Sequence, residues 1–133
     1  MIKKTGVERN LSVNYLKRAG ECLSGARAAF EDKKYDLSAI DSVHCGISSA
    51  DALCVYFLEC RHTGEKHEEV AELIKTIKGI KHDEAKALGD RIVKILRMKN
   101  MAEYEERSVK PKEAETLIQN AQKLFEMVKE KLR

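Results

Sequence analysis

The least charged part of the chain is a 24-residue stretch, YDLSAIDSVHCGISSADALCVYFL, at residues 35–58. Its only charged residues are Asp36, Asp41 and Asp51, and it contains no Lys, Arg or Glu. Apolar residues recur along it at steps of three and four, at Ile40, Val43, Ile47, Ala50, Cys54 and Phe57. This is the spacing of one face of an α-helix. A helix with so few solvated side chains is normally buried on most sides, so we predict a central helix with the other helices packed around it.

Four other segments show the same helical spacing. Helices are predicted from about Ser12 to Asp32, around residues 70–77, from about residue 83 to Glu105, and from Pro111 to about Leu132. Asp36 and Asp83 are predicted to cap the second and fourth helices. Residues 1–9 lack the pattern and are expected to form a loose N-terminal tail, and no alternating segment is long enough to predict a strand. The fold class is therefore all-α: an up-down bundle of four long helices plus one short helix, in one domain over residues 1–133.

The composition of the chain argues against several classes of protein but does not indicate a function. The net charge of +3 is too small to predict nucleic-acid binding by itself. Cysteines at positions 22, 45, 54 and 60 have no paired spacing and lie in predicted helices or at their ends, which is typical of reduced core residues in a cytoplasmic protein. The first ten residues, MIKKTGVERN, contain no apolar run, so no signal peptide is predicted. Three Asp, one His and four Ser make residues 35–58 a poor membrane span, so no membrane partner is expected.

The central helix carries a polar stripe, Asp41, His44, Ser48 and Asp51, at spacings of three, four and three residues. Such spacing places these side chains on one side of a helix. A His with two carboxylates within reach suits a proton-transfer site or part of a metal site. The same residues suit a polar seam that is hydrogen-bonded across a helix or dimer interface, because buried polar groups need partners. We favour the seam.

A second group, Cys60, His62 and His67, lies in the tract that follows the central helix. Mixed Cys and His residues can bind zinc, but a structural zinc site needs four ligands at recognisable spacing, and the sequence has no second pair. We therefore predict neither a metal nor a cofactor.

A third group lies near the end of the fourth predicted helix, in ILRMKNMAEYEER at residues 95–107. Arg97, Asn100, Met101 and Tyr104 share one face of this helix, whereas Lys99 points about 140° away from Tyr104. Lys99 and Glu103 are spaced to form an ion pair along the helix. Cations, an amide and a phenol suit a protein interface or a surface that binds phosphates or bases, and the same residues suit a solvated helix end. The candidate nucleotide- or RNA-binding residues are therefore Arg97, Lys99, Asn100 and Tyr104, and there is no Gly-rich phosphate loop.

Three tracts together resemble the HEPN superfamily of small helical domains. They are SAIDSVHCGISSADALCVYFL (38–58), RHTGEKHEEVAELI (61–74) and LRMKNMAEYEERSVKPKEAETLIQNAQKLFEMV (96–128). Each tract alone is weakly specific, but with the first helix their order and spacing extend the resemblance over about residues 12–132. The resemblance implies a bundle of four or five helices that is frequently a homodimer. Many members are metal-independent endoribonuclease toxins, often encoded beside a nucleotidyltransferase, so it also implies a nucleotidyltransferase partner.

The family's active site is an Arg followed, after four to six residues, by a His, and this motif is incomplete here. Tyr104 occupies the place of the His. The basic residue corresponds either to Lys99, which precedes Asn100 as the family's Arg commonly precedes Asn, or to Arg97, which shares a helical face with Tyr104. Both remain candidates.

Replacement of the His changes the function that the resemblance implies. A His titrates near neutrality, whereas a Tyr with a pKa of about 10 transfers protons poorly at neutral pH. The expected function is a HEPN-like module that binds RNA, a nucleotide or a partner protein and lacks strong nuclease activity. The alternative is a metal-independent endoribonuclease toxin of a toxin–antitoxin pair, with Arg97, Lys99 and Tyr104 as catalytic candidates. A third reading is a structural partner of a nucleotidyltransferase, with Tyr104 as a target for modification.

Overall fold

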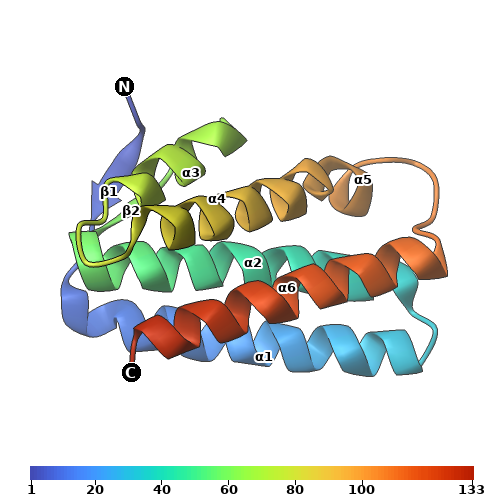
Figure 1. Cartoon of the computed structure of the whole chain (residues 1–133). Coiled ribbons are helices and arrows are strands. Elements are labelled where there is room, and N and C mark those ends of the chain that lie inside the picture. Colours follow the sequence, from blue (N-terminus) through green and yellow to red (C-terminus); the bar gives the residue numbers. More distant parts are fainter.

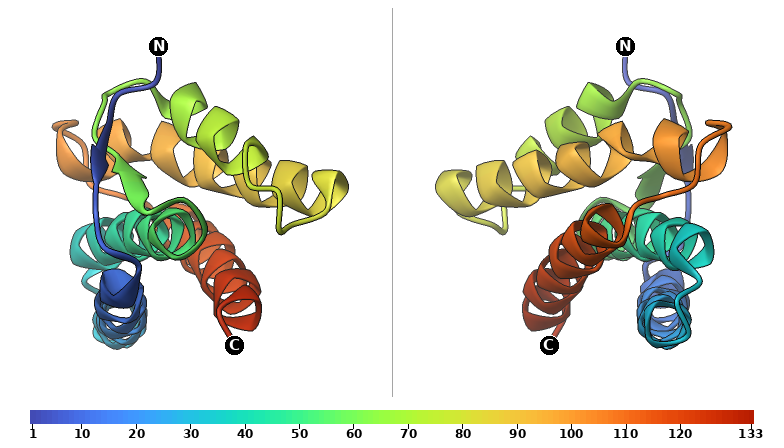
Figure 2. Two further views of the ribbon diagram at one scale, coloured as in Figure 1. Left: turned by 90° about the vertical axis from the view of Figure 1, so that its left-hand side faces the viewer. Right: turned by 90° about the vertical axis from the view of Figure 1, so that its right-hand side faces the viewer.

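The predicted central helix, α2 (Tyr35–Leu58), lies in the middle of the molecule and contacts every other long helix. A computed structural model describes residues 1–133. The other elements are β1 (Lys4–Gly6), the 3-10 helix η1 (Arg9–Leu11), α1 (Ser12–Glu31), β2 (Cys60–His62), α3 (His67–Lys75), α4 (His82–Arg97), α5 (Lys99–Glu103) and α6 (Pro111–Lys131). Helix α1 lies along one side of α2, α6 along another, and α4 and α5 cover a third (Figures 1 and 2). The prediction of an all-α bundle is confirmed.

Small side chains on α2 make this close packing possible. The buried hydroxyl of Ser38 donates to the carbonyl of Ala26 on α1, at 2.7 Å, so two helices meet without an unsatisfied polar group. On the side of α4, a Cβ added to Gly46 would lie 2.9 Å from Cγ2 of Ile95. The missing side chain therefore lets the buried Ile95 sit directly against the backbone of α2.

The prediction of a loose tail over residues 1–9 is wrong. Strand β1 pairs antiparallel with β2, with Lys4 opposite His62, Thr5 opposite Arg61 and Gly6 opposite Cys60. Two further contacts continue the attachment: the Val7 N–H donates to the Glu59 carbonyl at 2.9 Å, and the Arg9 Nε donates to the Tyr56 carbonyl at 2.6 Å. A strand of three residues is too short to show alternation, and its partner is more than 50 residues away in the sequence, so no local pattern predicted it.

The predicted fourth helix, from residue 83 to Glu105, is also wrong in one respect, because it is interrupted at Met98. The Met98 N–H bonds to the carbonyl of Ile95, three residues back, at 3.1 Å, which tightens the last turn of α4. The chain then forms α5 as a separate short helix. The interruption changes the directions in which the side chains that follow it point.

Neither predicted Asp cap is present. Helix α2 begins at Tyr35, and the Asp36 carboxylate accepts the N–H of Val109 at 2.7 Å, which ties the loop before α6 to the start of α2. Asp83 lies within the first turn of α4 and accepts the N–H of Glu84. Pro111 is the first residue of α6, as predicted.

Two further predictions concern the state of the cysteines and a possible membrane span. All four cysteines are free thiols; Cys45, Cys54 and Cys60 are buried and Cys22 is half-buried. None of the helices combines the length and the apolar character that a membrane crossing requires.

The contact between Gly46 and Ile95 predicts a difference between two matched Gly→Ala substitutions. Both gain the same helix propensity, but a Cβ at Gly20 meets only the ring of Phe125 at an ordinary 3.4 Å. We expect Gly46→Ala to be less stable than Gly20→Ala by at least about 1 kcal/mol, because overfilling a packed core costs typically 1–3 kcal/mol. Urea unfolding of both variants measures the difference. Equal stabilities would show that α4 does not depend on this contact.

Candidate functional site

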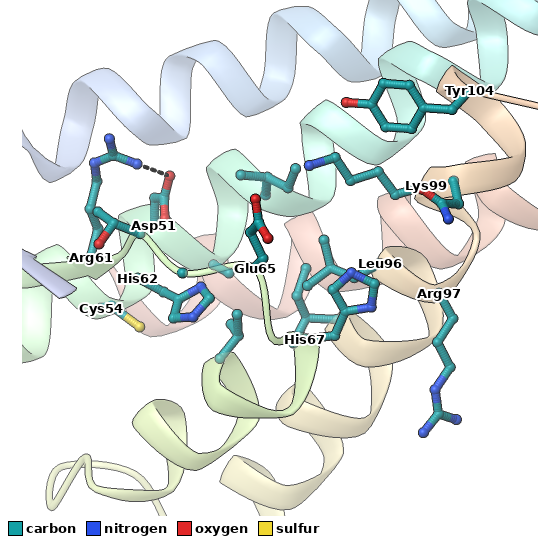
Figure 3. A pocket seen from close by; sticks show the side chains of 17 residues that line it. Asp51, Cys54, Arg61, His62, Glu65, His67, Leu96, Arg97, Lys99 and Tyr104 are labelled. Carbon is teal, nitrogen blue, oxygen red and sulfur yellow. Dashed lines mark ion pairs between the residues drawn. The ribbon is translucent and has the colours of Figure 1, made fainter. Parts of the chain in front are cut away.

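A pocket of about 840 Å³ opens between α2, the connection from β2 to α3, and the junction of α4 with α5 (Figure 3). Its polar lining comes from three separate tracts of the sequence: Asp51; Arg61, His62, Thr63, Glu65 and His67; and Arg97, Lys99, Asn100 and Tyr104. Its floor is apolar and includes Ile47, Cys54, Ile92 and Leu96. The packing of α3 and α4 over α2 therefore brings residues of all three predicted groups into one site.

The α4–α5 junction places Lys99, rather than Arg97, beside Tyr104. Figure 3 shows the side chains of Lys99 and Tyr104 extending in the same direction over the pocket, while Arg97 turns away from it. The Arg97 guanidinium instead lies 3.8 Å from a carboxylate oxygen of Glu68 on α3. The helical argument for Arg97 assumed a continuous helix, and the interruption at Met98 removes that assumption.

Tyr104 is the most accessible aromatic side chain at the pocket. It is 70% exposed, which is unusual for so large an apolar group, and it is the last residue before the loop to α6. Asn100 beside it is exposed and Lys99 is half-buried. This outer end of the pocket offers a ring face, a cation and an amide together.

The two histidines differ in how they are held. The His62 Nε2 lies 3.0 Å from Glu69 Oε1, and the Lys3 N–H donates to the same oxygen at 3.4 Å. The hydrogen bond with His62 is the main cause that lowers the pKa of Glu69. His67, the first residue of α3, lines the pocket without a side-chain hydrogen bond in the structure. The suggested zinc ligands do not assemble, because no three His, Cys, Asp or Glu side chains are close enough to hold a metal ion.

Asp51 and Arg61 form the end of the pocket opposite Tyr104 (Figure 3). The Asp51 Oδ2 lies 3.6 Å from Arg61 Nη1, and the Asp51 side chain is 11% exposed. Burial raises the pKa of Asp51 from an ordinary value of 3.8 to about 6, although the nearby Arg61 opposes this shift. A carboxylate that is still mostly ionised at neutral pH is thus held in a poorly hydrated place.

The polar stripe on α2 does not act as one cluster. The His44 Nε2 lies 2.9 Å from Glu103 Oε1, which links α2 to α5 and replaces the predicted pair of Lys99 with Glu103. Asp51 pairs with Arg61, as described, and the Asp41 carboxylate faces α1, where a Cβ on Gly25 would lie 2.8 Å from Oδ2. The stripe therefore provides separate contacts between elements, of which the one from His44 crosses to another helix.

Sequence reasoning missed Arg61 and Glu65 as residues of the site. The signal was weak, because both lie in a short polar tract whose course depends on the pairing of β2 with β1. Asp51 was selected as a member of the polar stripe, and its place in the pocket follows only from the position of that tract.

A comparison with protein-family models and a comparison with curated proteins give different results. The model of the HEPN domain matches residues 12–131. The matched segment contains every helix from α1 to α6 and all of the residues that line the pocket. No curated protein matches the chain.

The contact of His44 with Glu103 predicts the mobility of α5. His44→Ala removes the side chain that holds this short helix to α2, so we expect amide exchange over residues 100–105 to become several times faster. The unfolding free energy should fall by less than about 1 kcal/mol, because the His side chain is half exposed. Hydrogen–deuterium exchange measures the effect, with His82→Ala, an exposed site at the start of α4, as the control. Unchanged exchange in His44→Ala would show that α5 is held in another way.

The raised pKa of Asp51 predicts how stability depends on pH. Because the folded pKa is higher than the unfolded one, the folded state binds more protons between roughly pH 4 and 6, and this contribution to stability is lost as the pH rises through that window. Asp51→Asn cannot titrate. The unfolding free energy of Asp51→Asn minus that of wild type should therefore rise by at most about 3 kcal/mol between pH 4 and pH 7. Denaturant titrations at several pH values test this, and a constant difference would contradict it.

Proposed function

The chain belongs to the HEPN domain family, and on that basis we propose that it is a helical module that binds single-stranded RNA or its nucleotides without strong nuclease activity. The ligand would occupy the pocket at the α4–α5 junction. One observation carries the proposal: the exposed ring of Tyr104 lies over the same pocket as the ammonium group of Lys99.

The outer end of the pocket has the chemistry that single-stranded nucleic acids require. Bases stack on exposed aromatic rings whatever their sequence, at about 1–3 kcal/mol per base. Lys99 has no carboxylate partner, because Glu103 is engaged by His44, so its charge is available to a phosphate. The amide of Asn100 can bond to a base edge or a phosphate.

The expected lack of cleavage follows from the side chain at position 104. General acid–base catalysis by a positioned group typically contributes about 100-fold to 10,000-fold in rate. The phenol of a Tyr remains protonated at neutral pH and cannot serve as the base. The family's motif has a His where this chain has Tyr104. The ring of Tyr104 can stack on a base, but it does not replace the proton transfer of the His.

A second candidate function, endoribonuclease activity, is favoured by one observation. His67 lines the same pocket from the start of α3, and its imidazole is not engaged by a carboxylate. Imidazole is the side chain best suited to accept and donate protons near neutral pH. His67 could therefore supply the proton transfer that Tyr104 cannot.

The test of binding compares two cations at the same junction. We expect a fluorescently labelled single-stranded RNA, in the presence of a chelator, to bind wild type and remain intact. Lys99→Ala and Tyr104→Ala should each weaken binding about tenfold, because each removes a phosphate or stacking contact. Arg97→Ala is the matched control and should change the affinity less than threefold, because its side chain faces Glu68. Fluorescence anisotropy gives the affinities, and gel electrophoresis shows whether the RNA is cut.

Two outcomes would change the proposal. Equal losses in Arg97→Ala and Lys99→Ala would contradict the assignment of Lys99 to the site. Cleavage of the RNA by wild type that disappears in His67→Ala would replace the binding module with the endoribonuclease.

A further inference from the structure

The two ends of the pocket have different chemistry. Tyr104 and Lys99 form one end, and Asp51 with Arg61 forms the other, as Figure 3 shows. The floor between them is apolar, with Ile47, Ala50, Cys54, Ile92 and Leu96. A ligand that contacts both ends must therefore lie across an apolar floor and carry a different polar group at each end.

The size of the pocket exceeds the need of one nucleotide. At about 840 Å³ it lies in the upper part of the range of roughly 300–1,000 Å³ found for small-ligand sites. A base stacked on Tyr104 would sit at the rim, because that ring is 70% exposed. The inner part of the pocket would remain empty.

Asp51 and Arg61 form an ion pair at their end of the pocket, but the pair does not use all of the hydrogen-bonding positions of the two side chains. Asp51 Oδ2 and Arg61 Nη1 are 3.6 Å apart, longer than the 2.7–3.2 Å of a hydrogen bond. The structure contains no hydrogen bond to the Asp51 carboxylate, although its side chain is only 11% exposed. An ionised group that is buried without hydrogen bonds costs stability, as the pKa of about 6 for Asp51 also indicates. Such a group, facing a cavity, is a candidate for contact with a ligand that donates hydrogen bonds.

Nucleobases differ in what they can offer to this pair. Guanine presents two adjacent donors, the ring N1–H and the exocyclic amino group, which can bond to both oxygens of one carboxylate, whereas uracil presents a single ring N–H between two carbonyl acceptors. Guanine additionally presents two acceptors that an Arg can contact. A carboxylate beside a guanidinium can therefore accept two hydrogen bonds from guanine where it accepts one from uracil.

We propose that the pocket binds a segment of at least two nucleotides, with one base on Tyr104 and a guanine held by Asp51 and Arg61 in preference to uracil. This inference rests on the proposed function and specifies its ligand. It makes Asp51 and Arg61 determinants of specificity, whereas Lys99 and Tyr104 contact any sequence.

Titration calorimetry with four small ligands tests the inference: GMP, UMP and the dinucleotides GpG and UpU. Wild type should bind GpG at least tenfold more tightly than GMP, because only the dinucleotide reaches both ends. It should bind GpG about tenfold more tightly than UpU, the discrimination of one good pair of base contacts. In Asp51→Asn this second ratio should fall below threefold, since an amide has only one acceptor oxygen and cannot accept both donors of guanine, while its NH2 group can donate to a carbonyl of uracil.

A matched control and a second variant keep the test interpretable. Asp41→Asn is the same substitution on the same helix, but Asp41 lies outside the pocket, so the ratio of GpG to UpU should stay as in wild type. Arg61→Gln should lower the affinity for GpG severalfold, which provides an independent test should Asp51→Asn fail to fold. Circular dichroism confirms the folding of each variant.

The outcomes separate the inference from the function on which it rests. Equal affinities for GMP and GpG, or a ratio of GpG to UpU that is the same in wild type and Asp51→Asn, would overturn the inference and leave nucleotide binding intact. No binding of any of the four ligands or of single-stranded RNA would overturn the proposed function itself.

Discussion

The close contact of α4 with the backbone of α2 is the constraint on which the site depends. Gly46 leaves room for Ile95, and this contact sets how closely the two helices approach at that point. The end of α4 and the start of α5 then lie over α2, where His44 holds Glu103. Lys99 and Tyr104 acquire their positions from these two contacts. A larger residue at position 46 would move α4, and the outer end of the pocket with it.

The elements with local periodicity were the ones that the sequence predicted. Residues 35–58 have the composition of a buried helix throughout, and α2 has these same bounds. Features that depend on distant residues were not predictable in this way. The pairing of β1 with β2 joins residues more than 50 positions apart, and the interruption at Met98 occurs where α5 is held by His44 on another helix. Neither contact leaves a repeating pattern in the sequence near it.

Local patterns in the sequence identified most polar residues of the candidate site, but not the packing that brings them together. Asp51, His62, His67, Lys99, Asn100 and Tyr104 were all selected for their chemistry, but in three separate groups. Packing of α3 and α4 over α2 unites them, and no spacing along the chain encodes that union. The choice between Arg97 and Lys99 depended on whether one helix continued past residue 98. Tertiary contacts decide whether the helix continues there. The side-chain directions calculated for a continuous helix therefore did not hold for Lys99 and Tyr104.

The burial of Asp51 supports the proposal that the pocket is a binding site. Its neighbours on the buried side of α2 are small and neutral, and an alanine or serine would fit there without a titratable group. The fold instead keeps a carboxylate that burial disfavours, beside a guanidinium too distant for a hydrogen bond. Core stability alone does not account for this arrangement, because a neutral residue would avoid the desolvation cost. A ligand that donates hydrogen bonds would offset that cost only while bound. At its outer end the same pocket has the phenol ring of Tyr104, so the proposed ligand would meet a stacking surface at one end and a buried ion pair at the other.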